Sequence, residues 1–265
     1  MFGVAQKIKM RCSESITSLR APRLAATVSA FVILAASASS VSTAATQSRV
    51  NPPPSADLSY SISAKQSGLN VKGDSTIHWR TSDNKYAIAI ETNAMMFGKI
   101  LETRSEGTLA STGLVPARFT ERRYRKPEAV TIFNRTDKTV TYSESQQPYP
   151  LKGGEQDRSS IIWQLASIAR TNPGKFKAGS EWTFPVAGRR DIEPWTFKVI
   201  QTETIKLPRG EIPALHLQKI ASPNRDQEID VWLAPSLDWY PVQLRMSERD
   251  GATIEQKLQK VTPAP

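Results

Sequence analysis

The chain has 265 residues, of which 39% are apolar and 23% are charged, with 35 basic and 25 acidic side chains. The first 45 residues hold five of these bases and one of the acids, so the net charge of +10 falls to +6 for the remainder. A charge of +6 favours anionic lipid headgroups or acidic polymers over nucleic acid as partners, although it would also serve solubility alone. The remaining residues suit one large β domain or two smaller domains.

The first 45 residues have the three parts of a secretory signal peptide. Basic residues precede an uncharged apolar stretch, residues 24–38, and small side chains follow it. Signal peptidase prefers small residues one and three positions before the cut, so we expect cleavage after Ala38 or Ala45. An uncleaved anchor in the inner membrane is the alternative, because no charge occurs between Arg23 and Arg49. Its second half is rich in Ser, Thr and Ala, which insert poorly, so we predict export to the periplasm.

Beyond the export segment the chain has a short linker and one expected domain. The only cysteine, Cys12, precedes the apolar stretch, whereas a lipoprotein carries its lipidated cysteine after it. The exported chain would therefore contain no disulfide, and a chain of this length can bury enough core without one. Residues 46–56 contain three consecutive prolines, which favour an extended linker. We expect a single β-rich domain over residues 57–262.

Alternating apolar and polar residues recur over most of this domain. Clear examples are residues 58–62, 86–90, 195–199, 229–233 and 240–246. Such alternation is typical of antiparallel strands with one buried face, and turn-forming residues separate the segments. We predict a mainly β fold, in which roughly ten strands form an antiparallel meander. The meander should curl into a barrel or half-barrel, because long flat sheets are not tolerated.

One segment, at about residues 157–170, departs from the alternation and is predicted to be a helix. Asp157 is a good N-cap residue, helix-forming residues follow it, and Pro173 and Gly174 end the segment. Trp163 lies outside the main apolar stripe, so the helix is apolar over more than half of its circumference. We expect it to pack on the concave face of the sheet or to cover the opening of a barrel.

The register of the last hairpin can be predicted from its side chains. Pairing Val231 with Val242 places apolar residues opposite one another. The same register places Glu228 opposite Arg245, and pairs of opposite charge across strands are favourable.

No motif for catalysis or metal binding stands out. The two histidines are isolated, without the residue spacing of a metal site, and no Gly-x-Ser-x-Gly motif occurs. Asp226, Glu228 and Asp230 would share one face of a strand, at spacings seen in acid and base carboxylate pairs. A solvated strand face paired with Arg245 has the same pattern. We therefore assign no catalytic residue, no metal and no cofactor.

The basic run RFTERRYRK is the most pronounced surface feature. As a strand it would place Arg123 and Arg125 on one face and Arg122 and Lys126 on the other, each face with an aromatic residue. Cations beside aromatic rings suit phosphate or lipid headgroups near a barrel opening. An edge strand protected by charge would have the same composition. Together with Trp163 on the helix, these four residues are the candidate ligand-binding residues.

Short motifs occur in a fixed order over residues 58–249. They are a strand around Tyr60, the stretch 107–121, the helix start 156–160, the block 182–186, Pro208-Arg209-Gly210, and the closing segments 230–235 and 240–245. In this order they resemble a family of secreted Gram-negative proteins classed as a domain of unknown function, the DUF3108 type. The resemblance implies an exported, largely antiparallel β protein without assigned catalytic residues. The arrangement also resembles, more distantly, the half-barrel carriers of lipoproteins and lipids in the periplasm.

Three functions are compatible with these observations. The first is a non-enzymatic envelope protein that holds a lipid or other amphiphile in a β-barrel concavity, with its anionic head near the basic run. The second is a scaffold or interaction protein of envelope assembly with a filled core, whose protein partner the sequence does not identify. The third is an envelope hydrolase. We expect no nucleic-acid partner, and peripheral or no membrane contact after signal cleavage. An internal cavity would distinguish the first function from the second.

Overall fold

The computed structural model describes residues 50–66, 69–208, 210–220, 227–248 and 251–264. The expected signal peptide and both expected cleavage sites, Ala38 and Ala45, lie outside the described residues, as do the first four residues of the expected linker. Within the described ranges, no helix is both long enough and apolar enough to cross a membrane.

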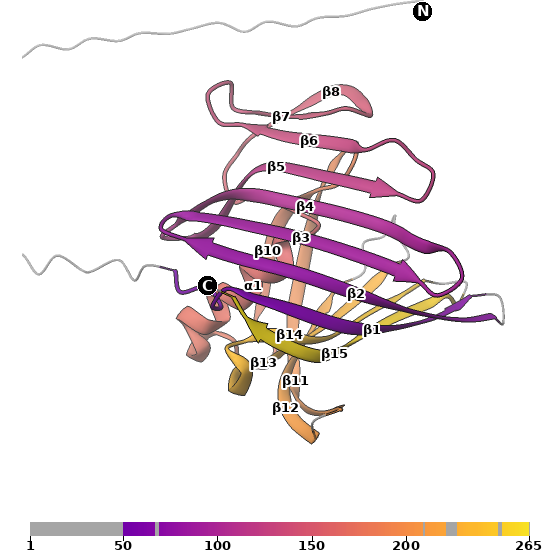
Figure 1. The fold of residues 1–265 in the computed structure, drawn as a ribbon. Helices are drawn as coiled ribbons and strands as arrows, with labels where there is room; N and C mark the ends of the chain where they lie inside the picture. Colours follow the sequence, from indigo (N-terminus) through magenta and orange to yellow (C-terminus); the bar gives the residue numbers. More distant parts are fainter. Residues whose placement is uncertain (1–49, 67–68, 209, 221–226, 249–250, 265) are drawn as a thin grey trace, which may run out of the picture. The chain divides into compact units, whose positions relative to one another are not determined.

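The described residues form one sheet of fifteen strands in meander order (Figure 1). Neighbours in the sheet pair antiparallel, except that β9 and β10 are parallel. The first and last strands pair with each other near the centre of the sheet. In sheet order the strands are β8 (Ser145–Pro150), β7 (Thr139–Tyr142), β6 (Ala129–Asn134), β5 (Gly113–Arg123), β4 (Gly98–Ala110), β3 (Lys85–Ala94), β2 (Leu69–Ser82), β1 (Ala56–Gln66), β15 (Thr253–Pro263), β14 (Tyr240–Ser247), β13 (Glu228–Ala234), β12 (Gly210–Lys219), β11 (Ile192–Leu207), β10 (Glu181–Ala187) and β9 (Gln156–Asp157).

The mainly β, antiparallel meander is confirmed, but the predicted strand number of roughly ten is too small. The strands β7, β8 and β9 contain four, six and two residues, which is too short for a period of two to be recognised. The two edge strands of the described sheet, β8 and β9, do not pair with each other. Closure into a complete barrel is therefore not part of the described structure.

The helix α1 (Ser160–Thr171) is enclosed by the sheet, and nine of its 12 residues are buried. Trp163 stacks on Trp79 of β2, with ring centroids 4.2 Å apart, and meets the ring of Tyr240 in β14 edge-on at 6.2 Å. Gln164 accepts a hydrogen bond from the backbone N–H of Leu114 in β5. The helix thus touches strands from both halves of the sheet, and the sheet must curve around it. Two short 3-10 helices, η1 (Pro173–Lys175) and η2 (Pro235–Leu237), complete the fold.

The helix starts two residues later than an N-cap at Asp157 predicts. Asp157 ends β9, where it pairs with Ala187 of β10, and the helix begins only at Ser160. The Asp157 carboxylate still caps the helix, because its Oδ1 accepts hydrogen bonds from the backbone N–H groups of Ser159 and Ser160, both at 2.8 Å. The N-cap position itself is Ser159, whose side chain makes no capping hydrogen bond.

The predicted register of the last hairpin is wrong by two residues. Val231 pairs with Leu244, and Asp230 rather than Glu228 pairs with Arg245. A β-bulge between Trp232 and Leu233 and the 3-10 helix η2 in the connection displace the register. Because side chains alternate with a period of two, a shift of two residues keeps every side chain on its face. The apolar pattern therefore could not reveal it.

The described part of the expected linker packs on the domain. Val50 is buried, the indole N–H of Trp79 donates to the carbonyl of Pro53 at 2.8 Å, and the Tyr240 hydroxyl donates to the carbonyl of Pro54 at 2.7 Å. These hydrogen bonds satisfy polar atoms of two large core side chains.

Candidate ligand-binding site

The strand register gathers several connections at one end of the sheet, which we call the mouth end. These are residues 95–97 between β3 and β4, 124–128 between β5 and β6, 143–144 between β7 and β8, and 188–191 between β10 and β11. The start of α1 lies there too, because Arg158 lines the same cleft as residues 189–191. Side chains that are far apart in the sequence thus meet at the mouth end.

An apolar cavity of about 600 Å³ lies between the sheet and the first half of α1. This volume is within the range of about 300–1,000 Å³ that small-molecule sites occupy. The helix contributes Ile162 and Trp163, and the two halves of the sheet contribute aliphatic side chains from both sides. Those side chains include Ile77, Ile90 and Leu101 from β2 to β4, and Ile229, Leu244 and Met246 from β13 and β14.

Cations line one part of this otherwise apolar cavity. They are Arg123 at the end of β5, Lys126 in the following turn, and Arg158 just before α1. The buried carboxylate of Glu121 lies beside them and accepts a hydrogen bond from Arg123 Nε at 2.5 Å. The cavity therefore has a long apolar wall and a cationic region.

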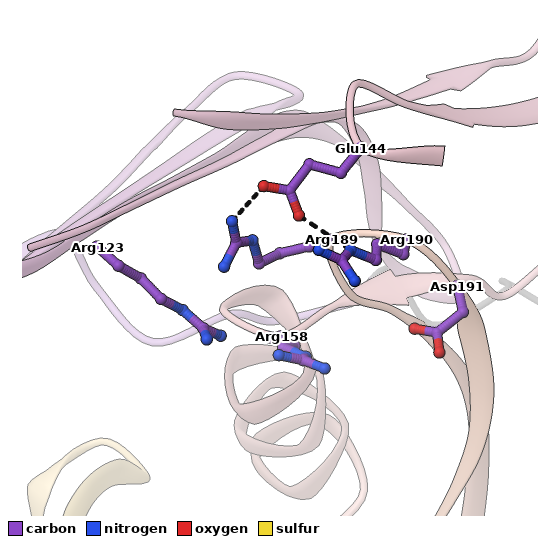
Figure 2. A pocket seen from close by; sticks show the side chains of 6 residues that line it. All are labelled: Arg123, Glu144, Arg158, Arg189, Arg190 and Asp191. Atoms are coloured by element: carbon purple, nitrogen blue, oxygen red, sulfur yellow. Dashed lines mark hydrogen bonds and ion pairs between the residues drawn. The ribbon is translucent and has the colours of Figure 1, made fainter. Parts of the chain in front are cut away.

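A second cavity of about 480 Å³, which we call the cationic cleft, shares Arg123 and Arg158 with the apolar cavity. Its lining is completed by Glu144, Arg189, Arg190 and Asp191 (Figure 2). Arg190 Nε lies 3.3 Å from one oxygen of Glu144, and Arg189 is ion-paired with the other. Figure 2 shows the Arg123 side chain pointing toward Arg158 from the opposite side of the cleft. Four guanidinium groups thus face two carboxylates, which leaves this cleft net positive.

Arg158 differs from the other three arginines of the cationic cleft, because those three form ion pairs with Glu121 or Glu144 and Arg158 has no internal counter-ion among the described residues. Within the described ranges it forms neither an ion pair nor a hydrogen bond, and it is only partly exposed. Its guanidinium lies against Gly188, where an added Cβ would come within 2.8 Å of Nη2. The missing side chain of Gly188 therefore leaves the room that Arg158 occupies, and the donors of Arg158 are available to a ligand.

The carboxylate of Asp157 fixes the backbone next to Arg158. It is fully buried, and Ser105 Oγ donates to its Oδ2 at 2.5 Å. Burial raises the pKa of Asp157 to about 6, although the hydrogen bonds from Ser105, Ser160 and Ser159 oppose this effect. Asp157 is thus a positioning residue that joins the start of α1 to β4.

Three of the five candidate residues from the sequence line the apolar cavity. Arg123 and Lys126 belong to its cationic part, and Trp163 forms part of its apolar wall while it stacks on Trp79. Their role in binding remains a prediction.

The other two candidates lie elsewhere. Arg122 is on the opposite face of β5, where it is 3.4 Å from Glu128, and Arg125 is in a turn with φ of 52° and stacks over Tyr124. The predicted grouping of Arg125 with Arg123 is wrong because β5 ends at Arg123, so the alternation of faces does not continue.

The sequence prediction missed Arg158, Arg189, Arg190 and Glu144. Each of them lies at least 18 positions after the end of the basic run in the sequence. They come together only because the strands of the folded meander bring their connections to the mouth end. The adjacent pair Arg189-Arg190 after Gly188 was the available signal, because a Gly followed by two bases marks an exposed cationic turn.

Glu228 and Asp230, the two described carboxylates among those considered for hydrolysis, differ in their surroundings. Asp226 lies outside the described residues, and Glu228 is exposed. Asp230 is buried, and its carboxylate binds His216 Nε2 at 2.8 Å and Arg245 Nη2 at 3.0 Å. Burial raises the pKa of Asp230, but these two partners outweigh it and leave the pKa below its usual value. Asp230 is thus an ionised member of an ion-pair network, and the expected pairing of an acid of this strand with Arg245 occurs.

His216 links this network to a second carboxylate. Its Nδ1 lies 2.9 Å from Glu203, so the two carboxylates bind opposite nitrogens of one ring. Two groups on opposite sides of an imidazole cannot chelate one ion with it. In the described part of the chain as a whole, no group of three or more His, Cys, Asp or Glu residues is arranged to hold a metal ion.

Residues 59–259 match the family described as protein of unknown function DUF3108, and the chain belongs to this family. The family resemblance of the sequence motifs is therefore confirmed. Comparison with curated proteins gave no match.

A solved structure shares the fold at low sequence identity. A β-barrel-like protein of the DUF1849 type from Brucella abortus has a TM-score of 0.53 and 11% identity, over 81% of this chain and 100% of that one. The two proteins therefore have the same fold. A hypothetical lipoprotein, YmcC from Escherichia coli, has a TM-score of 0.32 and 10% identity, over 82% of this chain and 91% of that one.

Proposed function

We propose that this protein is a non-enzymatic protein of the Gram-negative envelope that binds an amphiphile with an anionic head. The apolar part of the ligand would occupy the 600 Å³ cavity, and the head would lie at Arg123, Arg158 and Lys126. One observation carries the proposal. The apolar cavity and the cationic cleft share Arg123 and Arg158, so a single molecule could contact both.

The two parts of the site would contribute differently to binding. Burying apolar surface stabilises a complex by about 25 cal/mol per Å², which favours any apolar chain of suitable size without selecting its head. Hydrogen bonds from a guanidinium to a carboxylate or phosphate contribute about 1.5–3 kcal/mol each and require an anion. Affinity would therefore come chiefly from the cavity, and selectivity for an anionic head from the arginines.

The cavity supports this function over a scaffold with a filled core. The core does contain tightly packed parts, such as the stack of Trp163 on Trp79, but the space beside them is apolar and reaches the cationic cleft. Residues 1–45 support export, because their sequence has the parts of a signal peptide. The periplasm is therefore the proposed location.

Replacement of Arg158 tests the proposal, and Arg122 provides the control. Binding of a fluorescent fatty acid and of the matching fatty alcohol would be titrated by fluorescence. Arg158→Gln should weaken binding of the acid about tenfold, which corresponds to about 1.4 kcal/mol, and should leave binding of the alcohol unchanged. Arg122→Gln, on the opposite face of β5, should change neither affinity.

Two outcomes would contradict the proposal. One is that neither probe binds the wild-type protein. The other is that Arg158→Gln and Arg122→Gln weaken binding of the acid equally, because a general effect of charge would then replace a specific site.

A further inference from the structure

The connection between β3 and β4 exposes three consecutive large apolar side chains, which we call the apolar tip. Met95, Met96 and Phe97 are 78%, 84% and 57% exposed. The Phe97 ring lies 6.4 Å from that of Tyr124, which is itself 43% exposed and lies in the next connection at the mouth end. The four exposed side chains thus lie in two connections at the mouth end, and one of them, Tyr124, also lines the apolar cavity.

The turn itself does not require these side chains. The backbone is held by hydrogen bonds from Phe97 N to Ala94 O and from Met95 N to Lys72 O, and Gly98 supplies the left-handed φ of 67°. Polar residues would satisfy the same geometry. Contiguous exposed apolar surface on a soluble protein is typical of contacts with a membrane or another protein.

The charges around the apolar tip favour a membrane over a protein of mixed charge. Lys72, Arg125 and Lys126 are exposed, and within the described ranges none of the three forms an ion pair. Lys72 lies beside Met95 through the backbone hydrogen bond, and Arg125 stacks over Tyr124. Apolar and aromatic side chains surrounded by cations match the interface of a bilayer with anionic headgroups.

We propose that the apolar tip inserts into the surface of an anionic membrane, with Lys72, Arg125 and Lys126 against the headgroups. Tyr124 and Lys126 also line the apolar cavity, so insertion would direct the cavity opening toward the bilayer. The proposal does not depend on what the cavity binds, because the inserting side chains Met95, Met96 and Phe97 are not among those that line it.

A dye attached at the tip tests this orientation. In a Cys12→Ser background the chain has no cysteine, so Phe97→Cys and Ser111→Cys each provide a single labelling site for an environment-sensitive fluorophore. Ser111 is exposed in the connection between β4 and β5, at the opposite end of the sheet. Both exported proteins would be mixed with vesicles of phosphatidylglycerol and phosphatidylethanolamine, or of phosphatidylcholine alone.

With the anionic vesicles, the dye at position 97 should shift to the blue and gain intensity, whereas the dye at position 111 should not change. Arg125→Glu combined with Lys126→Glu should lower vesicle affinity at least tenfold. The control pair Lys175→Glu and Lys177→Glu, beyond the other end of α1, should leave it unchanged.

The orientation itself would be contradicted by equal responses at the two positions, and membrane insertion by no response at position 97. A retained N-terminal anchor could bring the protein to vesicles, but it would not by itself distinguish position 97 from position 111. Circular dichroism of each labelled variant checks that the fold is intact.

Discussion

Among the residues of the site, Arg158 shows most directly how local structure prepares a side chain for binding. Its backbone is fixed by the hydrogen bonds of the neighbouring Asp157, while its guanidinium lies against Gly188 without a counter-ion in the described part of the chain. A partly buried cation without a partner is costly, because a guanidinium removed from water loses hydrogen bonds. Its surroundings are therefore better suited to binding than to stability.

Gly188→Ala is predicted to displace Arg158 without unfolding the protein. The added Cβ would meet the flexible end of the arginine, which can move at little cost in stability. We expect a several-fold loss of affinity for the anionic probe and a change in unfolding free energy within about 0.5 kcal/mol. Gly174→Ala is the control, since an added Cβ there meets no atom within 4 Å. Unchanged affinity in Gly188→Ala would show that the position of Arg158 does not matter.

Asp157 should make stability depend on pH in a defined direction. Its pKa is about 6 in the folded protein and 3.8 as the reference for an unfolded chain, so the folded state binds the proton more tightly. This contribution is fully present below about pH 4 and is lost as the pH rises through 6. At 1.36 kcal/mol per pKa unit, the loss is about 3 kcal/mol.

Urea unfolding of wild type and Asp157→Asn at pH 4, 5 and 7 measures this loss. An asparagine Oδ1 can still accept from Ser159 and Ser160 but cannot ionise, so the variant should gain stability relative to wild type as the pH rises. A difference between the two proteins that stays constant with pH would show that Asp157 does not titrate in this range.

At the scale of elements, one glycine controls how α1 meets β5. Gly113 has φ of 126°, and a Cβ there would lie 2.0 Å from Oε1 of Gln164. That amide oxygen accepts from Leu114 N at 2.7 Å, and the amide nitrogen donates to the carbonyl of Thr112 at 2.9 Å. Both hydrogen bonds require the close approach that a glycine permits.

Gly113→Ala should therefore lower the free energy of unfolding by more than the backbone strain of an alanine at this φ would lower it. Gly210 has a similar φ of 122° but no atom within 4 Å of its added Cβ, so Gly210→Ala measures the strain. Strain of this kind costs about 1–3 kcal/mol, and loss of the two hydrogen bonds of Gln164, of which the one to Leu114 is buried, would add about 1–3 kcal/mol in Gly113→Ala. Equal unfolding free energies for the two variants, measured in urea, would mean that Gln164 does not hold the helix.

The elements with long periodic patterns were predictable from the sequence. The alternation around Tyr60 and Val231 marked true strands, and the segment after Asp157 marked the helix, because periodicity and capping are local properties. The end of β5 was not predictable, since Arg123 is followed by residues that could equally extend a strand. Its position decides which arginines reach the cavity.

At the scale of the molecule, the site depends on curvature that no local pattern encodes. The sheet wraps α1 so that β2 to β5 and β13 to β15 line one cavity, and residues 121, 144, 158 and 189 meet at the mouth end. The ion pairs of Arg189 with Glu144 and Glu121 join residues that are 45 and 68 positions apart, and a sequence pattern carries no information on such pairings. A basic surface with aromatic residues and a helix packed against the sheet were foreseeable from the sequence.

The cavity is unfilled space beside tightly packed parts of the core. Packed clusters lie beside it, among them one around Trp79 and Trp163 and another around Phe197 and Leu217. An apolar cavity that is empty costs stability in proportion to its volume, about 24 cal/mol per Å³ for cavities made by mutation. A bound apolar chain would offset that cost, so the fold and the proposed ligand favour each other.

Native mass spectrometry of protein purified from the periplasm without detergent, together with an organic extract of the same sample, tests the central claim most directly. We expect a population heavier than the polypeptide by a defined mass, and an amphiphile of that mass with an anionic head in the extract. The Arg158→Gln protein should carry less of it. A clean polypeptide mass from gently handled wild-type protein, with no amphiphile in the extract, would contradict the proposed function.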